Sequence, residues 1–362
     1  MRVAHLVAHN GLNGVSTSCK TLINAQLRRG HEILIITMPD AWLAKQVFEG
    51  QPELVFSHLK TRVGEIRRVG NVLRKWMPDI VHCHGSKANK YGMVFRIVAG
   101  APVVMTAHSR NVQIPPFFFR RVIAPSQQTA SFHNRKNLVP WKRLAVVQHL
   151  FEPVDPTIVS RTAGRKKLGE FGLNDDDFVI GIVGSIDPRK NQVDGLRIVS
   201  ELAPDHDNIR LVLIGGLSQT REMTDWHAMM AGAEIAKRVT LIGHRDGALD
   251  LIAGFDVLLC TSKIEEGPIV VLEAMSLEVP VVSSNVGMVP ELIRDGIDGF
   301  TFDVGDIKRA AEAIKSLAAN PELRTAIARQ GRQRLIEHCD ETTILNSIDT
   351  IYQRVQTEAG SR

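Results

Sequence analysis

The segment FDVLLCTSKIEEGPIVVLEAMSLEVPVVSS, residues 255–284, contains the pattern that decides the fold. A short apolar run at 255–260 is followed by a polar loop, a helical stretch that opens at Gly267-Pro268, and a second apolar run at 280–284. Two buried strands joined by a helix are typical of a parallel β-α-β unit. We therefore expect a parallel sheet covered by helices.

The same alternation of short apolar runs and helix-period stretches extends along the whole chain. It breaks down only around 151–177, which is rich in Pro, Gly and charge, and a length of 362 residues also favours two domains. We predict an α/β protein with two facing, doubly wound, Rossmann-like domains that bind ligands in a cleft between them. The expected strands lie near 2–8, 32–37, 53–57, 79–83, 102–106, 121–125, 178–184, 209–215, 239–242, 255–260 and 280–284.

The break in the pattern sets the expected domain boundaries. We predict an N-terminal domain at residues 1–160 that binds the acceptor, a C-terminal domain at 161–340 that binds the donor, and a final helix at 341–362 that packs back on the N-terminal domain. This helix needs a partner surface because four apolar residues share one of its faces: Ile344, Ile348, Ile351 and Val355.

Composition excludes several classes of protein. The hydrophobic fraction of 44% and the charged fraction of 23% are ordinary for a folded chain, and no window approaches 18 uninterrupted apolar residues. The first residues lack the apolar core of a secretory signal, so we expect a cytoplasmic protein. The four cysteines are far apart, which argues against a structural zinc site or a redox dithiol.

Charge is divided unevenly along the chain. Residues 1–150 contain 21 lysines and arginines against 6 acidic residues, whereas the remainder contains 23 against 33. A basic half favours an anionic membrane surface or an anionic or lipid-linked acceptor, although a solvated surface without a partner is about equally consistent. The amphipathic basic stretch 62–76 and PPFFFRR at 115–121 are candidates for such contacts. Each could equally be structural, as a sheet-covering helix and a buried loop. We expect no nucleic-acid partner.

The helix that opens at Gly267-Pro268 is a candidate phosphate site. Unpaired backbone N–H groups and the positive end of the helix dipole converge at such a helix N-terminus. Pro268 is expected at the first helical position, where its missing N–H costs nothing. Glu265 precedes the helix, and Glu273 lies roughly 9 Å along its axis. Two carboxylates that bracket a diphosphate suit a nucleoside diphosphate sugar, which has hydroxyls on both sides of the diphosphate.

At this point the sequence resembles a known family. Glu265-x7-Glu273, continued by LEAM, PVV and Gly287…Pro290-Glu291, is similar to retaining glycosyltransferase family 4, the group 1 family, which has the GT-B fold. The resemblance covers nearly the whole chain, because other family segments follow in order: GLNGVSTSCKTLINAQLRRGHEILIIT at 11–37, PDIVHCHGSKA at 78–88, PVVMTAHS at 102–109 and VGSIDPRKN at 183–191.

The resemblance implies roles for residues of the donor domain. Glu265 would hold hydroxyls of the donor sugar and Glu273 the ribose hydroxyls. The backbone of the segment that contains Gly267, Pro268, Ile269 and Val270 would bind the diphosphate. Three departures from the family pattern are Glu266, Gly267 and His149-Leu150, where the family usually has glycine, an aromatic residue and Asn-Gly.

The family's Arg-x4-Lys pair, which neutralises the leaving diphosphate, corresponds here to Ser185 and Lys190. We expect Arg189 to replace the missing arginine, because a departing diphosphate still needs cationic charge near it. By the same resemblance, Lys190, Glu265 and His108 would be the catalytic residues, with His108 close to the reacting sugar. Gly14 would let the backbone approach the phosphates, and Gly243, His244 and Arg245 would contact the nucleotide base.

These expectations describe a retaining glycosyltransferase that moves a sugar from a UDP-sugar, rather than a GDP-sugar, to a lipopolysaccharide or other cell-envelope polysaccharide acceptor. The resemblance implies no obligatory metal and no cofactor besides the donor. His82 and His84 form an H-x-H pair, but no third metal ligand is evident.

Three alternatives remain. One is a GT-B sugar-nucleotide epimerase, and another is a catalytically silent nucleotide-sugar-binding subunit, which Ser185 and Glu266 favour. A nicotinamide oxidoreductase is the weakest, because no G-x-G-x-x-G follows a strand.

Overall fold

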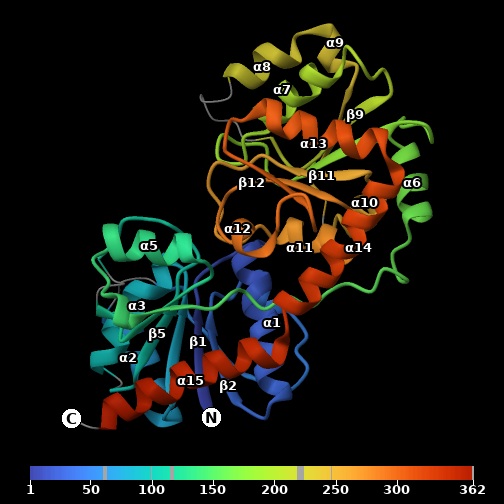
Figure 1. Cartoon of the computed structure of the whole chain (residues 1–362). Coiled ribbons are helices and arrows are strands. Elements are labelled where there is room, and N and C mark those ends of the chain that lie inside the picture. Colours follow the sequence, from blue (N-terminus) through green and yellow to red (C-terminus); the bar gives the residue numbers. More distant parts are fainter. Residues whose placement is uncertain (60–62, 99, 115–117, 218–223, 246, 361–362) are drawn as a thin grey trace. The chain divides into compact units, whose positions relative to one another are not determined.

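The computed structural model describes residues 1–362 except 60–62, 99, 115–117, 218–223, 246 and 361–362 (Figure 1). The chain divides into two compact units. We call Met1–Glu152 together with Cys339–Arg362 the N-unit, and Pro153–His338 the C-unit. The division after Glu152 precedes the expected boundary at 160, because Ser160 already caps a helix of the C-unit.

The N-unit is built on a seven-stranded parallel sheet with the order β3-β2-β1-β4-β5-β6-β7. The order reverses between β1 and β4, which makes this pair the topological switch point. The strands are β1 (Arg2–Val7), β2 (Glu32–Thr37), β3 (Glu53–Phe56), β4 (Ile80–His84), β5 (Val103–Thr106), β6 (Arg121–Ala124) and β7 (Leu144–Val146).

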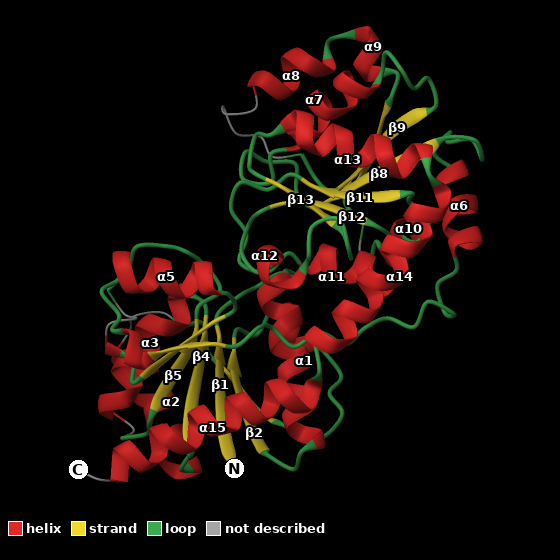
Figure 2. Cartoon of the chain, viewed as in Figure 1, coloured by secondary structure: helices red, strands yellow, loops and turns green. Residues whose placement is uncertain are grey.

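Helices cover both faces of this sheet, and strand residues alternate between them (Figure 2). Val3 and Val7 share a core with α1 (Gly14–Arg28) and α15 (Glu341–Gly360). Ala4 and Leu6 share the other core with helices of the opposite face. Those helices are α2 (Val63–Trp76) and α3 (Ser86–Val98). Among the described residues, the unit also contains η1 (Trp42–Lys45), α5 (Gln127–Lys136) and η2 (Trp141–Arg143).

The C-terminal helix α15 belongs to the N-unit. It contacts α1 and β5 and lies along the lower part of the N-unit in Figure 1. The apolar face expected from the sequence is buried there, together with Leu345 and Tyr352: Ile344, Ile348, Ile351 and Val355.

The apolar face of α2 is also buried. Of the two expectations for residues 62–76, a membrane-surface helix and a sheet-covering helix, the structure supports the second for this face. Val69, Leu73 and Trp76 are at most 7% exposed, and the indole N–H of Trp76 donates to Glu53 at 2.7 Å. Of the apolar residues expected on this face, Val63 is exposed. The helix therefore covers the sheet with a basic outer surface. Arg62 and residues 115–117 of the aromatic stretch lie outside the described residues.

The C-unit contains a six-stranded parallel sheet with the order β10-β9-β8-β11-β12-β13, and its switch point lies between β8 and β11. The strands are β8 (Phe178–Val183), β9 (Ile209–Ile214), β10 (Val239–Gly243), β11 (Val257–Cys260), β12 (Val281–Ser284) and β13 (Phe300–Phe302). The helices are α6 (Arg161–Gly169), α7 (Gln192–Leu202), α8 (Thr224–Met230), α9 (Ala233–Ala236), α10 (Leu249–Ile252), α11 (Ile269–Ser276), α12 (Val289–Leu292), α13 (Ile307–Ala319) and α14 (Pro321–His338).

Part of the stretch expected to form the domain boundary is an integral helix of the C-unit. Asp256 is 3% exposed and pairs with Arg161 at 2.5 Å and with Arg165, both on α6. It also accepts the backbone N–H of Val179 at 2.8 Å. A buried carboxylate needs such compensation, so these contacts fix α6 to the sheet. None of the helices in the described ranges combines the length and the apolarity that crossing a bilayer requires.

Candidate active site

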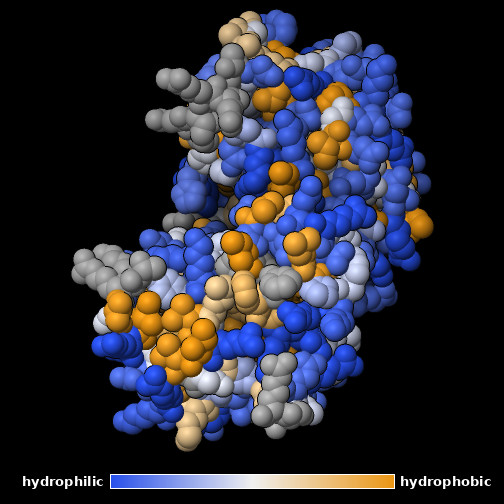
Figure 3. Space-filling view, turned by 90° about the vertical axis from the view of Figure 1, so that its left-hand side faces the viewer, coloured by the Kyte–Doolittle hydropathy of each residue, from blue (hydrophilic) through white to orange (hydrophobic). Residues whose placement is uncertain are grey.

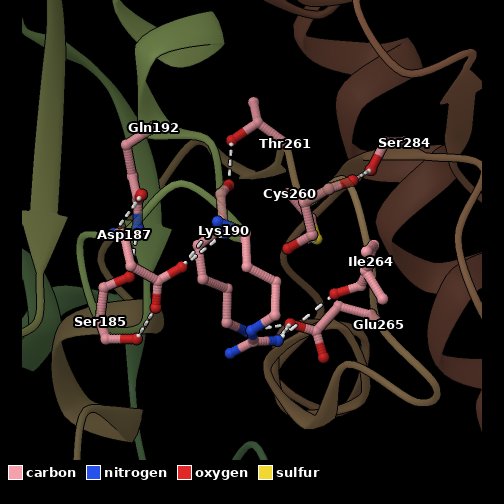
Figure 4. A network of polar contacts seen from close by, with 11 residues as sticks. Ser185, Asp187, Lys190, Gln192, Cys260, Thr261, Ile264, Glu265 and Ser284 are labelled. Atoms are coloured by element: carbon pink, nitrogen blue, oxygen red, sulfur yellow. Dashed lines mark hydrogen bonds and ion pairs between the residues drawn. The ribbon is translucent and has the colours of Figure 1, made fainter. Parts of the chain in front are cut away.

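The candidate site of the C-unit lies where β8 and β11 end, at the switch point of the sheet (Figure 4). The loop after β8 carries Ser185, Arg189 and Lys190. The loop after β11 carries Glu265 and leads into α11. Ligands of doubly wound folds bind at this position, because the loops from neighbouring strands diverge there.

Lys190 and Arg189 converge on a single carboxylate. Glu265 Oε1 lies 2.6 Å from Lys190 Nζ and 2.6 Å from Arg189 Nη1. The Glu265 side chain is 11% exposed and that of Lys190 17%, whereas that of Arg189 is 47% exposed. The structure thus brings together three of the residues expected around the diphosphate, and two cations share one acid.

Ser185, at the position of the family arginine, stabilises the turn that carries these cations. Its hydroxyl donates to Asp187 Oδ2 at 2.6 Å. Asp187 Oδ1 in turn accepts the backbone N–H groups of Arg189 at 2.9 Å and Lys190 at 2.8 Å. Asp187 therefore positions both cations. The sequence analysis missed it, although an aspartate that precedes a polar turn is a signal for this kind of capping.

The two loops are also bonded to each other. Thr261 Oγ1 donates to the carbonyl oxygen of Lys190 at 3.0 Å, and the backbone N–H of Lys263 donates to that of Arg189 at 2.8 Å. Gly184 has φ +137°, and a Cβ there would lie 3.2 Å from Lys190 Cε. Glycine therefore leaves room for the Lys190 side chain to extend along the loop toward Glu265.

The helix α11 begins at Ile269, and Pro268 is its N-cap rather than its first residue as expected. Pro268 has φ −69° and ψ 99°, so its backbone is extended. The first N–H groups of any α-helix have no acceptor within the helix, and those of Ile269 and Val270 belong to this set. The segment from Gly267 to Val270 therefore offers backbone donors and the positive end of the helix dipole.

Gly287, after β12, supports the loop that leads to α11. It has φ +55°, and a Cβ there would lie 2.4 Å from the carbonyl oxygen of Glu266 and 2.5 Å from that of Glu265. The backbone N–H of Met288 donates to the carbonyl oxygen of Glu266 at 3.0 Å. Only glycine permits this close approach, which fixes the backbone of both glutamates.

Glu273 lies one turn into α11 and is partly buried. Burial raises the pKa of its carboxyl group. Within the described ranges, the carboxylate has no hydrogen-bond or ion-pair partner. A desolvated acceptor without a partner on the protein is suited to receive hydroxyl groups from a ligand.

Gly243, His244 and Arg245 lie at the end of β10, at the edge of the sheet. β9 separates this strand from β8, so they stand roughly 10 Å along the sheet edge from the Lys190 loop. Gly243 has φ +79°, and the Arg245 guanidinium lies 5.4 Å from the ring centre of Phe171.

Gly14 and His108 belong to the N-unit. Gly14 is the first residue of α1, and Asn13 caps this helix by accepting N–H groups at 3.0 Å. His108 follows β5 and stacks on His149, with ring centroids 5.0 Å apart. Both residues lie at the carboxyl-end edge of their sheet, as α1 follows β1.

Two family models match the chain. The model described as "Glycosyltransferase Family 4" matches residues 12–152, and the one described as "Glycosyl transferases group 1" matches residues 165–334. The chain belongs to the group 1 glycosyltransferases. These matches confirm the family resemblance.

Curated relatives of this glycosyltransferase are distant. N-acetyl-alpha-D-glucosaminyl L-malate synthase of Bacillus anthracis is 24% identical over 209 residues, which are 58% of this chain and 54% of that protein. The chain thus spans about half the length of that relative. The lipopolysaccharide core biosynthesis glycosyltransferase LpsE of Rhizobium meliloti is 25% identical over 347 residues, 93% of this chain and 94% of that protein.

A solved structure confirms the fold. HepE of Anabaena, crystallised in complex with UDP, superposes with a TM-score of 0.81 at 19% identity, over 98% of this chain and 100% of that chain. The glycosyltransferase therefore has the expected α/β architecture of two Rossmann-like domains that characterises the GT-B fold.

The N-unit of the glycosyltransferase also contains a histidine cluster that the sequence analysis did not anticipate. Ring nitrogens of His5, His82 and His84 lie within 4.8 Å of one another, so His5 is the third potential metal ligand that was not evident in the sequence. The period of two along β1 and β4 places these side chains on one face of the sheet, which is the signal that could have revealed it.

Burial keeps this cluster uncharged at neutral pH. It lowers the pKa values of His5 and His149 to about 4, and those of His82, His84 and His108 well below 6.5. Each ring nitrogen of His5, His82 and His84 has a hydrogen-bond partner on the protein. Hydrogen bonds therefore link the neutral rings to one another and to the surrounding side chains.

Proposed function

We propose that the protein is a retaining glycosyltransferase that transfers a hexose from a UDP-sugar to a lipopolysaccharide or other cell-envelope polysaccharide acceptor. The observation that carries this proposal is the convergence of Lys190 and Arg189 on Glu265 beside the N-terminus of α11. HepE is a UDP complex and LpsE is named for lipopolysaccharide core biosynthesis, and both likenesses favour these substrates.

The donor diphosphate would bind at the N-terminus of α11. The backbone donors of Ile269 and Val270 would bond to its oxygens, and Lys190 and Arg189 would turn from Glu265 toward the negative charge. Glu265, released from its ion pairs, would then accept hydroxyl groups of the sugar. These cations stabilise the charge that develops on the leaving diphosphate, which is the main contribution of such a site to the rate.

Glu273 would accept the two ribose hydroxyls of the same donor. Its carboxylate lies one turn from the phosphate-binding amides, and burial strengthens each hydrogen bond that it accepts. The base would then extend toward Gly243, His244 and Arg245, roughly 10 Å along the sheet edge.

Transfer with retention requires attack on the face from which the diphosphate leaves. The acceptor oxygen forms a bond to the anomeric carbon as the bond from that carbon to the diphosphate breaks, and a phosphate oxygen takes the hydroxyl proton. Lys190 and Glu265 position the donor and stabilise charge, the role of His108 is assigned by the family resemblance alone, and no side chain forms a covalent intermediate. We propose that no metal ion is needed, because α11 and the two cations supply the positive charge.

We also propose that the enzyme is cytoplasmic and reaches its acceptor at an anionic membrane surface. Figure 3 shows apolar side chains gathered on the face of the N-unit that carries α2 and α3. Exposed residues on or beside these helices include Val63, Met77 and Ile97. The outer surface of α2 adds exposed cations, which attract anionic lipids: Arg67, Arg68, Arg74 and Lys75. Flotation with anionic vesicles tests this; binding that is absent at low salt, or that Arg67→Glu with Arg68→Glu does not reduce, would contradict it.

A donor screen tests the catalytic proposal. The purified enzyme is incubated with UDP- and GDP-sugars and a cell-envelope extract. Release of the nucleoside diphosphate is measured with and without EDTA. We expect release from a UDP-sugar, dependent on the extract and unchanged by EDTA. The anomeric configuration of the product, read by NMR, should match that of the donor.

The same screen separates the alternatives. An epimerase would change the donor without the extract, and a silent binding subunit would bind UDP without releasing it from any donor. Ser185 favours the silent subunit, because the family arginine is absent at this position. The presence of Arg189 at Glu265 argues for activity, because a second cation is available beside Lys190.

A further inference from the structure

A chain of hydrogen-bonded histidines leads from the interior of the N-unit to His108. His5 comes from β1 and His84 from β4, the two strands at the switch point, and His108 follows β5. His5 Nδ1 lies 3.0 Å from His84 Nε2, and His84 Nδ1 lies 3.1 Å from His108 Nε2. His5 and His84 are at most 1% exposed, so water does not compete for these contacts.

The inner end of this chain is the carboxamide of Gln26, on α1. Gln26 is fully buried, and its Oε1 lies 2.7 Å from His5 Nε2. Its Nε2 donates to the phenol oxygen of Tyr352 at 3.2 Å. A carboxamide oxygen only accepts hydrogen bonds, so the hydrogen between Gln26 and His5 must be carried by His5 Nε2.

One assignment then determines the next, because a neutral imidazole carries a hydrogen on only one nitrogen. With Nε2 protonated, His5 Nδ1 is an acceptor and takes the Nε2–H of His84. His84 Nδ1 is therefore also an acceptor and takes the Nε2–H of His108. This leaves the Nδ1 of His108 without a hydrogen.

We infer that Gln26 is a positioning residue that holds His108 in the Nε2–H tautomer, so that His108 offers Nδ1 as a hydrogen-bond acceptor to a hydroxyl of a bound sugar. The identity of that hydroxyl rests on the proposed function, whereas the tautomer follows from the N-unit alone. Gln26 acts through two intervening rings and does not itself touch a substrate.

Tyr352 keeps the carboxamide in this orientation. The phenol lies 2.7 Å from His82 Nδ1, a distance typical of an O–H donor, whereas 3.2 Å to Gln26 Nε2 is within the range of an N–H donor. His82 can then donate from Nε2 to Thr106 Oγ1, 2.7 Å away. If the carboxamide rotated by 180°, every hydrogen bond of the chain would reverse, and His108 would present an Nδ1–H donor instead.

The test is the tautomer of His108, observed by long-range ¹⁵N–¹H NMR on the full chain labelled at histidine. The His108 signals are assigned by their loss in His108→Gln. We expect Nε2 protonated and Nδ1 unprotonated at neutral pH. Protonation of Nδ1 in the wild type would overturn the inference. Histidine signals shifted by zinc already bound to the purified protein would also overturn it, because they would show a metal at His5, His82 and His84.

Two variants test the role of Gln26. Gln26→Met removes the acceptor for His5, and Tyr352→Phe frees the carboxamide to rotate, so both should give a mixture of His108 tautomers. Gln353→Met, at an exposed neighbouring position on α15, is the matched control and should leave the signals unchanged. A His108 tautomer that is unaltered in both variants would show that Gln26 does not set it.

Kinetics connect the tautomer to the reaction. Because the Nε2–H tautomer alone accepts the sugar hydroxyl, kcat of Gln26→Met should fall in proportion to the fraction of His108 left in that tautomer, about twofold for equal amounts, while the KM for the UDP-sugar, which binds the C-unit, stays unchanged. Mixed tautomers with an unchanged kcat would overturn the positioning role. A wild-type enzyme without any transfer would instead contradict the proposed function, and the NMR result would still decide the tautomer.

Discussion

Lys190 is the side chain with the most direct part in the proposed chemistry. Its ammonium group is held by Glu265, and its backbone is held by Asp187 and Thr261. A donor diphosphate would meet a cation that is already oriented and largely removed from water. Such preorganised charge is worth more than a mobile surface cation, because the protein does not reorganise during the reaction.

We expect Lys190→Ala to lower kcat roughly 10²- to 10³-fold, because it removes a positioned charge from the leaving group. Arg189→Ala should cost less, about tenfold, because this side chain is nearly half exposed. UDP release from the preferred donor measures both. The control is Lys166→Ala, an exposed lysine on α6. A normal rate in Lys190→Ala would remove this residue from the mechanism.

At the residue scale, the sequence identified side chains whose type and spacing indicate their chemical role. Glu265 and Glu273 were predicted in this way, whereas the role of Lys190 was implied by the family resemblance. Asp187 and Gln26 were not, because their importance depends on hydrogen bonds that only the folded backbone creates. The chain from Gln26 to His108 joins segments far apart in sequence, and no local pattern encodes such contacts.

The loop between β11 and α11 is the element on which the donor site depends. It approaches the backbone of Gly287 so closely that any side chain there would collide with carbonyl oxygens of the loop. A change at this glycine therefore tests the loop without altering a charged residue.

We expect Gly287→Ala to weaken UDP binding and to lower Tm, because the new methyl group displaces the backbone of Glu265 and Glu266. Gly305→Ala is the matched control: Gly305 also has a positive φ, +88°, but a Cβ there meets nothing within 4 Å. The control should lower the free energy of unfolding only by the backbone strain, about 1 kcal/mol, and Tm accordingly. Equal effects of the two changes on UDP affinity, measured by calorimetry, would show that loop contact is unimportant.

At the scale of elements, apolar periodicity predicted every strand of four or more residues. The strands β7 and β13 were missed because three residues are too few to show a period. The helix α6 was not predicted, because it lies in a stretch rich in Pro, Gly and charge. Two of its arginines pair with the buried Asp256, a tertiary contact that the sequence does not reveal. Membrane contact through the apolar face of α2 was excluded only when that face was found in the core.

At the scale of the whole molecule, the two units differ in their content of buried histidine. Five histidines of the N-unit have strongly lowered pKa values: His5, His82, His84, His108 and His149. In the C-unit, burial lowers the pKa of His338 to about 4. A lowered pKa means that the folded state binds fewer protons than the unfolded state. The associated stability is fully present above pH 6.5 and is lost as the pH falls toward 4.

We therefore expect the N-unit to be the acid-labile one. His5 and His149, with pKa values of about 4, should each destabilise it by about 2 kcal/mol at pH 5 relative to pH 7.5. Calorimetry at pH 5 should show the Tm of the N-unit fall below that of the C-unit. The N-unit contains three of the four tryptophans, so tryptophan fluorescence identifies its transition. Transitions that move together between these pH values would contradict this account of the histidine cluster.

The two-domain architecture itself could be predicted from the sequence, because alternation of strands and helices restarts after the break near 151–177. The GT-B fold followed from the resemblance and is confirmed by HepE. The division after Glu152 could not be placed, because the helix cap at Ser160 and the anchoring of α6 are tertiary features.

The most direct test of the central claim is a calorimetric titration of UDP into the wild type, Glu273→Ala and the control Glu312→Ala, an exposed change on α13. If α11 holds the nucleotide as proposed, the wild type and the control bind UDP equally. Glu273→Ala should then bind roughly 10- to 100-fold more weakly, through loss of hydrogen bonds to a charged acceptor. Equal affinity in all three proteins, or no binding by the wild type, would contradict it.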